Sequence, residues 1–476
     1  MNRHAFVPWV MVFLLLGAGG SGVLAGPDNG GLEEFLADTP EGEWSELTID
    51  TTRDVGTHLD VAVLPGTGAP YVSYYDESGA DLWFARFVGS GGNCGPGNSW
   101  GCQLVGSTGD VGKYNSIAVR DTGTTIQVII TYLTGSSLGY AWGECSAGGC
   151  TFTPYSIQSG TTNVVTRGLY TSVEFGSNGY PYIAYHTLTN TNSGYAMIAT
   201  RAFGSGNCGV GAVAGLWQCD TILNAPGLGS YTSVALNAAG ALNVAFYDAT
   251  NGRPYHAVRV GSGGNCGPSN SWYCRSPYIN THDTGRSISA FVESSGTPHV
   301  AYVDATTQEM VYASYVGSSG NCGFSSITTQ FEWQCDVIDD NIGSVGAGRT
   351  VAITADAADE PMIAYRDASS MVGPPVLMFA QPYHVAPPGA VPNCGPISMI
   401  HTWSCSMLDD AGAYQEEAAA VAIASNPEGM AIAYHELDTY AFPVEGNLKV
   451  HLRQIPFFAD GFETGDLSRW SFVTTP

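Results

Sequence analysis

Short hydrophobic runs bounded by turn residues recur along most of the chain. A first run begins near seven positions that lie 54 to 70 residues apart: Val61, Ile117, Val173, Val234, Ile288, Val351 and Val421. A turn containing Gly or Pro follows, and then a second run that ends in an aromatic residue and often an acid, as in Tyr71–Asp76 and His299–Asp304. Because these runs are short, β-branched and aromatic, they predict strands.

Two further runs complete each unit, so the pattern predicts four antiparallel strands per repeat. No long amphipathic helical pattern interrupts them. Four-stranded sheets that recur at this period are typical of a β-propeller, in which each sheet buries its faces against its neighbours. We therefore predict an all-β protein with seven blades.

The two ends of the repeat region complement each other. The seventh unit stops near Gln454 without a fourth strand, whereas the segment 44–50 matches the fourth strand 333–339, with Glu46 in place of a cysteine. We expect this N-terminal strand to complete the last blade and close the ring. The propeller would then span residues 44–455.

The cysteines follow the same repeat. Asn-Cys-Gly is followed by Trp-x-Cys in five units, and a shorter pair stands in another. A local pair in each unit predicts six disulfides, since disulfides are typical of exported proteins and no histidine recurs beside the cysteines to complete a zinc site. The expected pairs are Cys94–Cys102, Cys145–Cys150, Cys208–Cys219, Cys266–Cys274, Cys322–Cys335 and Cys394–Cys405.

The flanking segments and the charge indicate an exported protein. Residues 1–25 have the polar start, apolar core and small-residue end of a signal peptide, and residues 26–43 form an acidic, flexible leader. The role of the tail 456–476 stays open between an attachment tag and a disordered end. The net charge of −26 disfavours nucleic acid and anionic membranes as partners, and no run after the signal predicts a membrane span. We expect a secreted, periplasmic or cell-surface protein; its oligomeric state stays open.

The repeated motif resembles a known group of sequences. The pattern Ser-Ile-Ala…Gly-x-Pro-x-Ile-Ala-Tyr-x-Asp, present in segments such as 116–118, 180–185 and 296–302, resembles repeats of exported bacterial β-propeller proteins. This resemblance implies the fold and covers residues 44–454. Members of the group are mostly uncharacterised, so it implies no activity.

Catalytic and cofactor motifs lack the context they need. Gly97-Asn98-Ser99-Trp100-Gly101 matches a nucleophile elbow but lies in a cysteine loop instead of a strand–turn–helix. We expect no cofactor. Bound Ca²⁺ stays open, since no EF-hand loop is present to support it. The acids that end the second strands are expected to cap turns.

The predicted topology gathers one set of polar residues at the mouth of the central funnel. The turns after the second strands and the connections between blades share that face. Three arginines converge there in a chain with few cations, and arginine suits carboxylates and sugar hydroxyls. The candidate ligand-binding residues are Arg286, Arg349, Arg366, Asp304, Asp367, His435 and Glu436.

Two functions fit this pattern. The favoured hypothesis is a non-catalytic binding or structural propeller that recognises a glycan or a surface protein. The alternative is a carbohydrate-active enzyme, a hydrolase or lyase on acidic glycans, with its site in the same funnel. Paired carboxylates about 5–10 Å apart across a pocket would favour a glycosidase.

Overall fold

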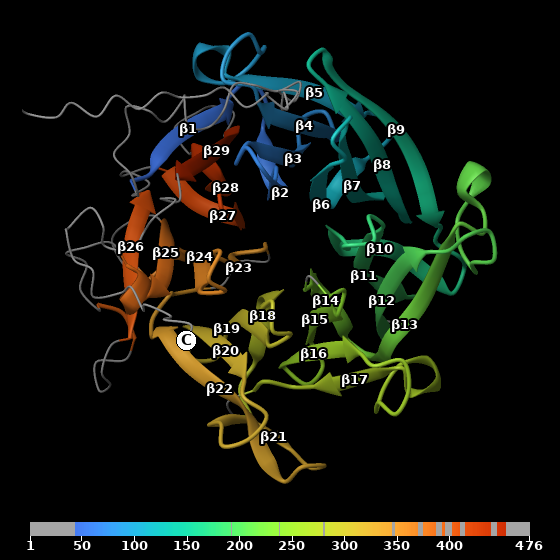
Figure 1. Cartoon of the computed structure of the whole chain (residues 1–476), viewed down its shortest axis with the longest axis vertical. Helices are drawn as coiled ribbons and strands as arrows, with labels where there is room; N and C mark the ends of the chain where they lie inside the picture. The colour runs from blue at the N-terminus through green and yellow to red at the C-terminus, as the bar shows by residue number, and fades with distance from the viewer. Residues whose placement is uncertain are drawn as a thin grey trace, which may run out of the picture.

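The computed structural model describes residues 43–453, except 192, 238, 279–280, 345–347, 370–374, 387–392, 396–401, 410–414 and 439–444. The predicted signal peptide, nearly all of the leader and the tail 456–476 lie outside this range. The described chain forms seven antiparallel sheets around a central channel, which confirms the seven-bladed propeller (Figure 1).

Each of the first six blades uses consecutive strands, with the first strand innermost. In the first three blades these strands are β2 (Val55–Val63), β3 (Pro70–Asp76), β4 (Asp81–Phe87) and β5 (Trp100–Gly106); β6 (Val111–Asp121), β7 (Ile126–Thr134), β8 (Ser137–Ser146) and β9 (Gly149–Gln158); and β10 (Val164–Phe175), β11 (Pro181–Thr189), β12 (Ser193–Arg201) and β13 (Trp217–Pro226).

The fifth blade carries one short additional strand, β21 (Cys322–Ser325), which pairs with the outer strand. The other strands of blades four to six are β14 (Leu228–Leu236), β15 (Leu242–Asp248), β16 (Arg253–Arg259) and β17 (Trp272–Arg275); β18 (Thr284–Val292), β19 (Pro298–Asp304), β20 (Glu309–Tyr315) and β22 (Gln330–Asp339); and β23 (Val351–Ala355), β24 (Pro361–Asp367), β25 (Val376–Pro382) and β26 (Trp403–Asp409).

The seventh blade joins the two ends of the described chain. Strands β27 (Gln415–Asn426), β28 (Gly429–Asp438) and β29 (Glu445–Arg453) are completed by β1 (Ser45–Asp50), which pairs antiparallel with β29. Ser45 lies opposite Leu452, and Leu47 opposite Val450. The predicted closure by the N-terminal strand is therefore confirmed.

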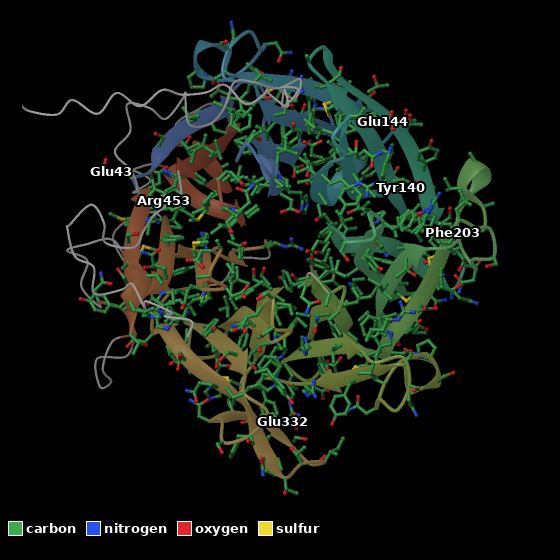
Figure 2. The ribbon with its side chains drawn as sticks, viewed as in Figure 1. Glu43, Tyr140, Glu144, Phe203, Glu332 and Arg453 are labelled. Atoms are coloured by element: carbon green, nitrogen blue, oxygen red, sulfur yellow. A yellow bond between two sulfur atoms is a disulfide. The ribbon has the colours of Figure 1, made fainter. Side chains whose placement is uncertain are left out.

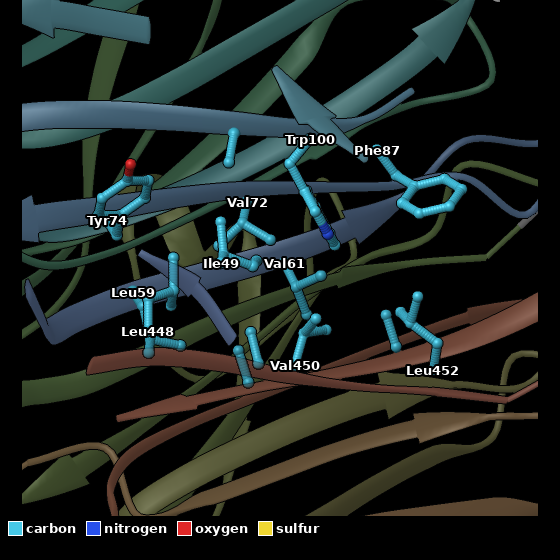
Figure 3. Packing of buried hydrophobic residues seen from close by; sticks show 14 of the residues in the cluster. Ile49, Leu59, Val61, Val72, Tyr74, Phe87, Trp100, Leu448, Val450 and Leu452 are labelled. Atoms are coloured by element: carbon cyan, nitrogen blue, oxygen red, sulfur yellow. The ribbon is translucent and has the colours of Figure 1, made fainter. Parts of the chain in front are cut away.

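The hydrophobic core is divided among the seven interfaces between blades. The cluster at the closure contains Ile49 of β1, Val61 and Val72 of the first blade, and Val450 and Leu452 of β29 (Figure 3). Burial of such side chains typically contributes about 1.5–3 kcal/mol each. Because every blade depends on both neighbours for its core, the closure contributes to the stability of the whole ring.

The structure explains the Asn-Cys-Gly and Trp-x-Cys repeat. All six expected disulfides are present. In the first copy, the Asn93 side chain donates to the Cys102 carbonyl at 2.9 Å and accepts from the Cys102 amide at 2.7 Å. Both bonds recur in the other four copies of the motif, between Asn207 and Cys219, Asn265 and Cys274, Asn321 and Cys335, and Asn393 and Cys405. The motif therefore closes a loop and needs no ligand.

The strand directions define two faces of the ring. We call the face with the blade-to-blade connections and the turns after the second strands the funnel face, and the opposite face the cysteine-loop face. None of the helices described is long and apolar enough to cross a bilayer. The six disulfides fit an oxidising environment such as the cell exterior.

Candidate functional site

The inner strands surround a central channel (Figure 2). The channel contains a cavity of about 360 Å³ with a largely polar lining. Serines at equivalent positions line it, and each hydroxyl accepts a hydrogen bond from the backbone of the next blade. Ser116 accepts from the Val173 amide at 3.1 Å, and Ser172 accepts from Val234 at 3.0 Å. Ser233 and Ser289 repeat this bond, and Asp60 begins the series by accepting from Ser116 and Ile117. These bonds join inner strands that belong to different sheets.

A strained bulge positions the residues just above this serine ring. The register of the inner strand shifts in blades two to five, where one residue has a left-handed conformation. From blade two to blade five, the left-handed residues are Tyr114 (φ 54°), Tyr170 (φ 49°), Tyr231 (φ 54°) and Ser287 (φ 55°). Left-handed backbone is uncommon for bulky residues and costs about 1–3 kcal/mol, and such strain concentrates at functional sites.

Three of these residues belong to an aromatic arc, defined as His58, Tyr114, Tyr170 and Tyr231. The ring centroids of His58 and Tyr114 are 4.6 Å apart, and both tyrosine pairs that follow are 4.7 Å apart. The arc covers blades one to four at the funnel end of the channel. The equivalent positions in blades five to seven are Ser287, Thr350 and Ala420, so the mouth has one aromatic side and one side of small residues.

Arg349 extends from the sixth blade across the channel to the opposite wall. Its Nη2 donates to the carbonyl of Thr232 at 3.1 Å and to that of Thr171 at 3.4 Å, in blades four and three. Within the described part of the chain its other N–H groups make no hydrogen bond. Arg349 lines both the channel cavity and a smaller pocket of about 40 Å³ on the funnel side.

The walls of this funnel pocket come from the aromatic arc. Besides Arg349 it is lined by His58, Tyr114 and Tyr170 from three blades, and the remaining lining residues are Thr57, Leu59, Asn115, Gly348 and Ala420. One water molecule occupies about 30 Å³ of liquid, so the pocket accommodates one small polar group and not a whole sugar ring. A carboxylate fits this volume, and the guanidinium supplies the complementary charge.

Burial controls the ionisation of the groups around Arg349. Burial lowers the pKa of the His58 imidazole to about 4, and the charges of Lys113 and Arg349 act in the same direction. His58 is therefore neutral at pH 7. Burial also raises the pKa of the Glu174 carboxyl, lower in the channel, to about 8. The pKa of Asp60 is raised by burial and lowered again in part by Arg349.

The three predicted arginines have different surroundings. Arg286 is half-exposed at the funnel mouth, where its Nη2 donates to Asp283 at 2.7 Å. Arg349 lies in the channel. Arg366, on the second strand of blade six, donates from Nη1 to the Ser344 carbonyl at 3.3 Å. Arg286 and Arg349 are equivalent in sequence, but Ser287 after Arg286 is left-handed and Thr350 after Arg349 is not. Of these two arginines, Arg349 lines the channel cavity.

The predicted acids and His435 have structural partners. Asp304 is fully buried, accepts from the amides of Thr306 and Thr307, and lies 3.0 Å from Nδ1 of His282. Asp367 accepts from the Ser369 amide at 2.7 Å. Both side chains cap turns.

His435 and Glu436 lie within the closing blade. His435 is 2% exposed, and a β-carbon on Gly446 would overlap its Nε2. Burial lowers the pKa of His435 to about 4. Glu436 is 2.7 Å from the Lys449 ammonium and accepts from Asn447 at 2.8 Å. Neither residue lines the funnel pocket.

The sequence contained a signal for the missed pocket residues. Gly-x-Tyr-x-Ser lies within the first strand of blades two to four, and Gly-Thr-His-Leu-Asp and Gly-Arg-Ser-Ile-Ser replace it in blades one and five. The glycines have positive φ, and a β-carbon on Gly112 would lie 2.9 Å from Leu82 Cα in the preceding blade. Aligning the units on this motif would have placed the arc at the channel mouth.

One group of potential metal ligands occurs among the described residues. Oxygen or nitrogen atoms of Glu46, Asp409 and His451 lie within 4.8 Å of one another. The Lys449 ammonium is 3.0 Å from both carboxylates. A cation of the chain itself therefore already contacts both carboxylates and offsets part of their charge.

Comparisons with known proteins find only remote structural similarity. No family model and no curated protein matches the chain. Among solved structures, the chain is similar to the polysaccharide lyase Uly1, with 10% identity, 88% of this chain and 90% of that chain covered, and a TM-score of 0.42.

Two further solved structures share this degree of similarity. One is the Hadza microbial sialidase Hz136, with 10% identity, 84% and 66% coverage and a TM-score of 0.39. The other is the WD40 domain of SCAP from fission yeast, with 12% identity, 84% and 82% coverage and a TM-score of 0.36. Similarity at this level supports no statement about a site or an activity of this chain.

Proposed function

We propose that this protein is secreted and binds an acidic glycan at the funnel face. The observation that carries the proposal is Arg349, which lies at the floor of a pocket walled by His58, Tyr114 and Tyr170. A ligand carboxylate would enter the pocket and meet the guanidinium, while the sugar rings would lie across the aromatic arc. Aromatic walls with a few polar groups are typical of small-molecule sites.

Because the protein as a whole is acidic, an acidic ligand needs a positive group such as Arg349 at its binding site. The chain carries a net charge of −26, which repels an acidic ligand at long range. Beyond a Debye length of about 8 Å at physiological salt, however, this repulsion is largely screened. Arg349, inside the channel, is much less screened than a surface cation would be.

Lyase activity at the same pocket is the second candidate. The neutral His58 imidazole could remove the proton from C5 of a uronate, the electron pair would form a C4–C5 double bond, and a tyrosine of the arc would protonate the departing O4. Burial raises the pKa of Tyr114, which keeps its phenol protonated. Among the described residues that line the pocket none is a carboxylate, which disfavours the two-carboxylate hydrolase.

Binding measurements with Arg349 variants test the proposal. Titration calorimetry with oligogalacturonate and with its carboxyl-reduced, neutral analogue separates charge from shape. We expect wild type to bind only the acidic form, and Arg349→Met to bind it about 10-fold to 100-fold more weakly, because a hydrogen bond to a charged group contributes about 1.5–3 kcal/mol. Arg349→Lys, which keeps the charge, should retain part of the affinity.

The exposed Arg259 on the cysteine-loop side provides a matched control. Arg259→Met should bind as wild type does. Equal affinity of wild type for the neutral and acidic forms, or full affinity of a folded Arg349→Met variant, would refute the proposal. Ultraviolet absorbance of an unsaturated product, lost in His58→Ala, would establish the lyase instead of simple binding.

A further inference from the structure

Among the residues that the structure describes at the funnel mouth, the same three-residue arrangement occurs twice. In the first copy, the Tyr75 hydroxyl donates to Asp110 Oδ1 at 2.9 Å, and the Lys113 ammonium is 2.8 Å from Asp110 Oδ2. In the second, the Tyr247 hydroxyl donates to Asp283 Oδ1, and Arg286 donates to Asp283 Oδ2 at 2.7 Å. We call these the two rim triads.

Both triads are built from the same elements. The tyrosine comes from the second strand of one blade, the aspartate from the connection to the next blade, and the cation from the start of the next inner strand. Lys113 and Arg286 each follow their aspartate by three residues and directly precede a left-handed residue. The triads are three blades apart, in blades one and two and in blades four and five.

The triads flank the aromatic arc. Lys113 directly precedes Tyr114 in the chain, and its charge lowers the pKa of His58. At the other end, the charge of Arg286 opposes the rise in the pKa of Tyr231 caused by burial. A ligand that follows the arc from His58 to Tyr231 would therefore meet a cation at each end and Arg349 below the middle.

Stability does not explain the paired arrangement. The cation side chains are 32% and 42% exposed, and ion pairs at such positions contribute about 0–1 kcal/mol. The phenols, in contrast, are nearly buried. In each triad the buried tyrosine orients the aspartate, and the aspartate holds the cation at a defined place on the rim. A side chain fixed in this way is suited to binding a ligand.

We propose that Lys113 and Arg286 are two equivalent subsites for separate acidic units of one polymeric ligand. The inference rests on the proposed function, because Arg349 would hold a third carboxylate between them. Two copies of one subsite match a ligand with a repeating unit, such as a polyuronate, better than a single sugar. When two sugar units of one polymer bind two subsites at the same time, the overall affinity increases although each unit makes the same contacts.

A series of galacturonate chains of one to six units tests the inference. For wild type we expect affinity to rise at least about tenfold with chain length. Lys113→Met and Arg286→Met should each lose part of this gain, and the double variant should lose it while binding the single unit as wild type does. Arg259→Met should retain the full gain, and thermal unfolding should show every variant folded.

The outcomes separate this inference from the proposed function. If no uronate binds wild type, the proposed function is wrong and the subsites with it. If the single unit and the hexamer bind equally well, or if the double variant keeps the full gain, only the subsites are wrong. A double variant that unfolds at a much lower temperature without altered chain-length dependence would make the triads purely structural.

Discussion

The hydroxyl of Ser172 shows how single residues hold the centre of the ring together. Inner strands of adjacent blades belong to different sheets, so their backbone amides find no strand partner across the gap. The Ser172 hydroxyl accepts from the Val234 amide at 3.0 Å and is 8% exposed. Equivalent serines and Asp60 repeat this in neighbouring blades, which explains why small hydroxyl residues recur at the channel wall.

We predict that Ser172→Ala lowers the free energy of unfolding by about 1–3 kcal/mol, because it leaves the buried Val234 amide without an acceptor. Urea denaturation measures this change. Ser90→Ala, at an exposed position in a cysteine loop, should have no measurable effect. Identical stability of the two variants would show that water replaces the hydroxyl without cost.

The strand β1 closes the ring through both hydrophobic and charged contacts. Lys449 of β29 lies opposite Thr48 of β1, and its ammonium is within 3.0 Å of Glu46, Asp409 and Glu436. Lys449 is 9% exposed, so this cluster joins three strands of the closing blade to the sixth blade at a largely buried site. Lys449 thus adds a charged contact to the backbone pairing and the hydrophobic packing of the N-terminal strand.

Lysine substitutions compare this cluster with a surface pair, because Lys113 and Lys449 are the chain's two lysines. Lys449→Met should lower the free energy of unfolding by roughly 3–5 kcal/mol, since it leaves buried carboxylates without their cation. Lys113→Met removes an exposed pair and should cost no more than about 1 kcal/mol. Chemical denaturation of both variants measures the difference, and equal losses would contradict the prediction.

Buried histidines give the whole ring a dependence on pH. Burial lowers the pKa of five of them to about 3 or 4: His58, His186, His256, His435 and His451. Each remains neutral in the folded state at a pH where the unfolded chain binds a proton. Their contribution to stability is therefore complete above pH 6.5 and is lost as the pH falls toward 4. Glu174 acts in the opposite direction.

We predict that the melting temperature falls as the pH is lowered from 6.5 to 4. The raised pKa of Glu174 favours the folded state below pH 4.5, and this contribution is lost as the pH rises toward 8. Glu174→Gln should therefore raise the melting temperature at pH 8 and have little effect at pH 5. Calorimetry across this range checks both trends; a melting temperature independent of pH would show that the histidines are hydrated.

Most of the fold followed from local patterns in the sequence. Strands, blade number, disulfides and closure were predictable because each depends on residues close in sequence or on one complementary strand at the chain's ends. The alignment between units was shifted by two residues in blades five to seven. The residues that pair as Val61 does are Ala290, Ile353 and Ile423, and not Ile288, Val351 and Val421. Strand side chains alternate with a period of two, so such a shift preserves the pattern.

The site depended on long-range geometry. Arg286 and Arg349 have the same sequence context, yet Arg286 lies at the rim and Arg349 crosses the channel. The backbone differs directly after them, since Ser287 is left-handed and Thr350 is not. The arc unites residues from four blades, more than 170 positions apart between His58 and Tyr231. The sequence alone determined the repeating units and their cross-links; only the closed ring decided which side chains share the channel mouth, since that depends on backbone twist and on contacts between blades.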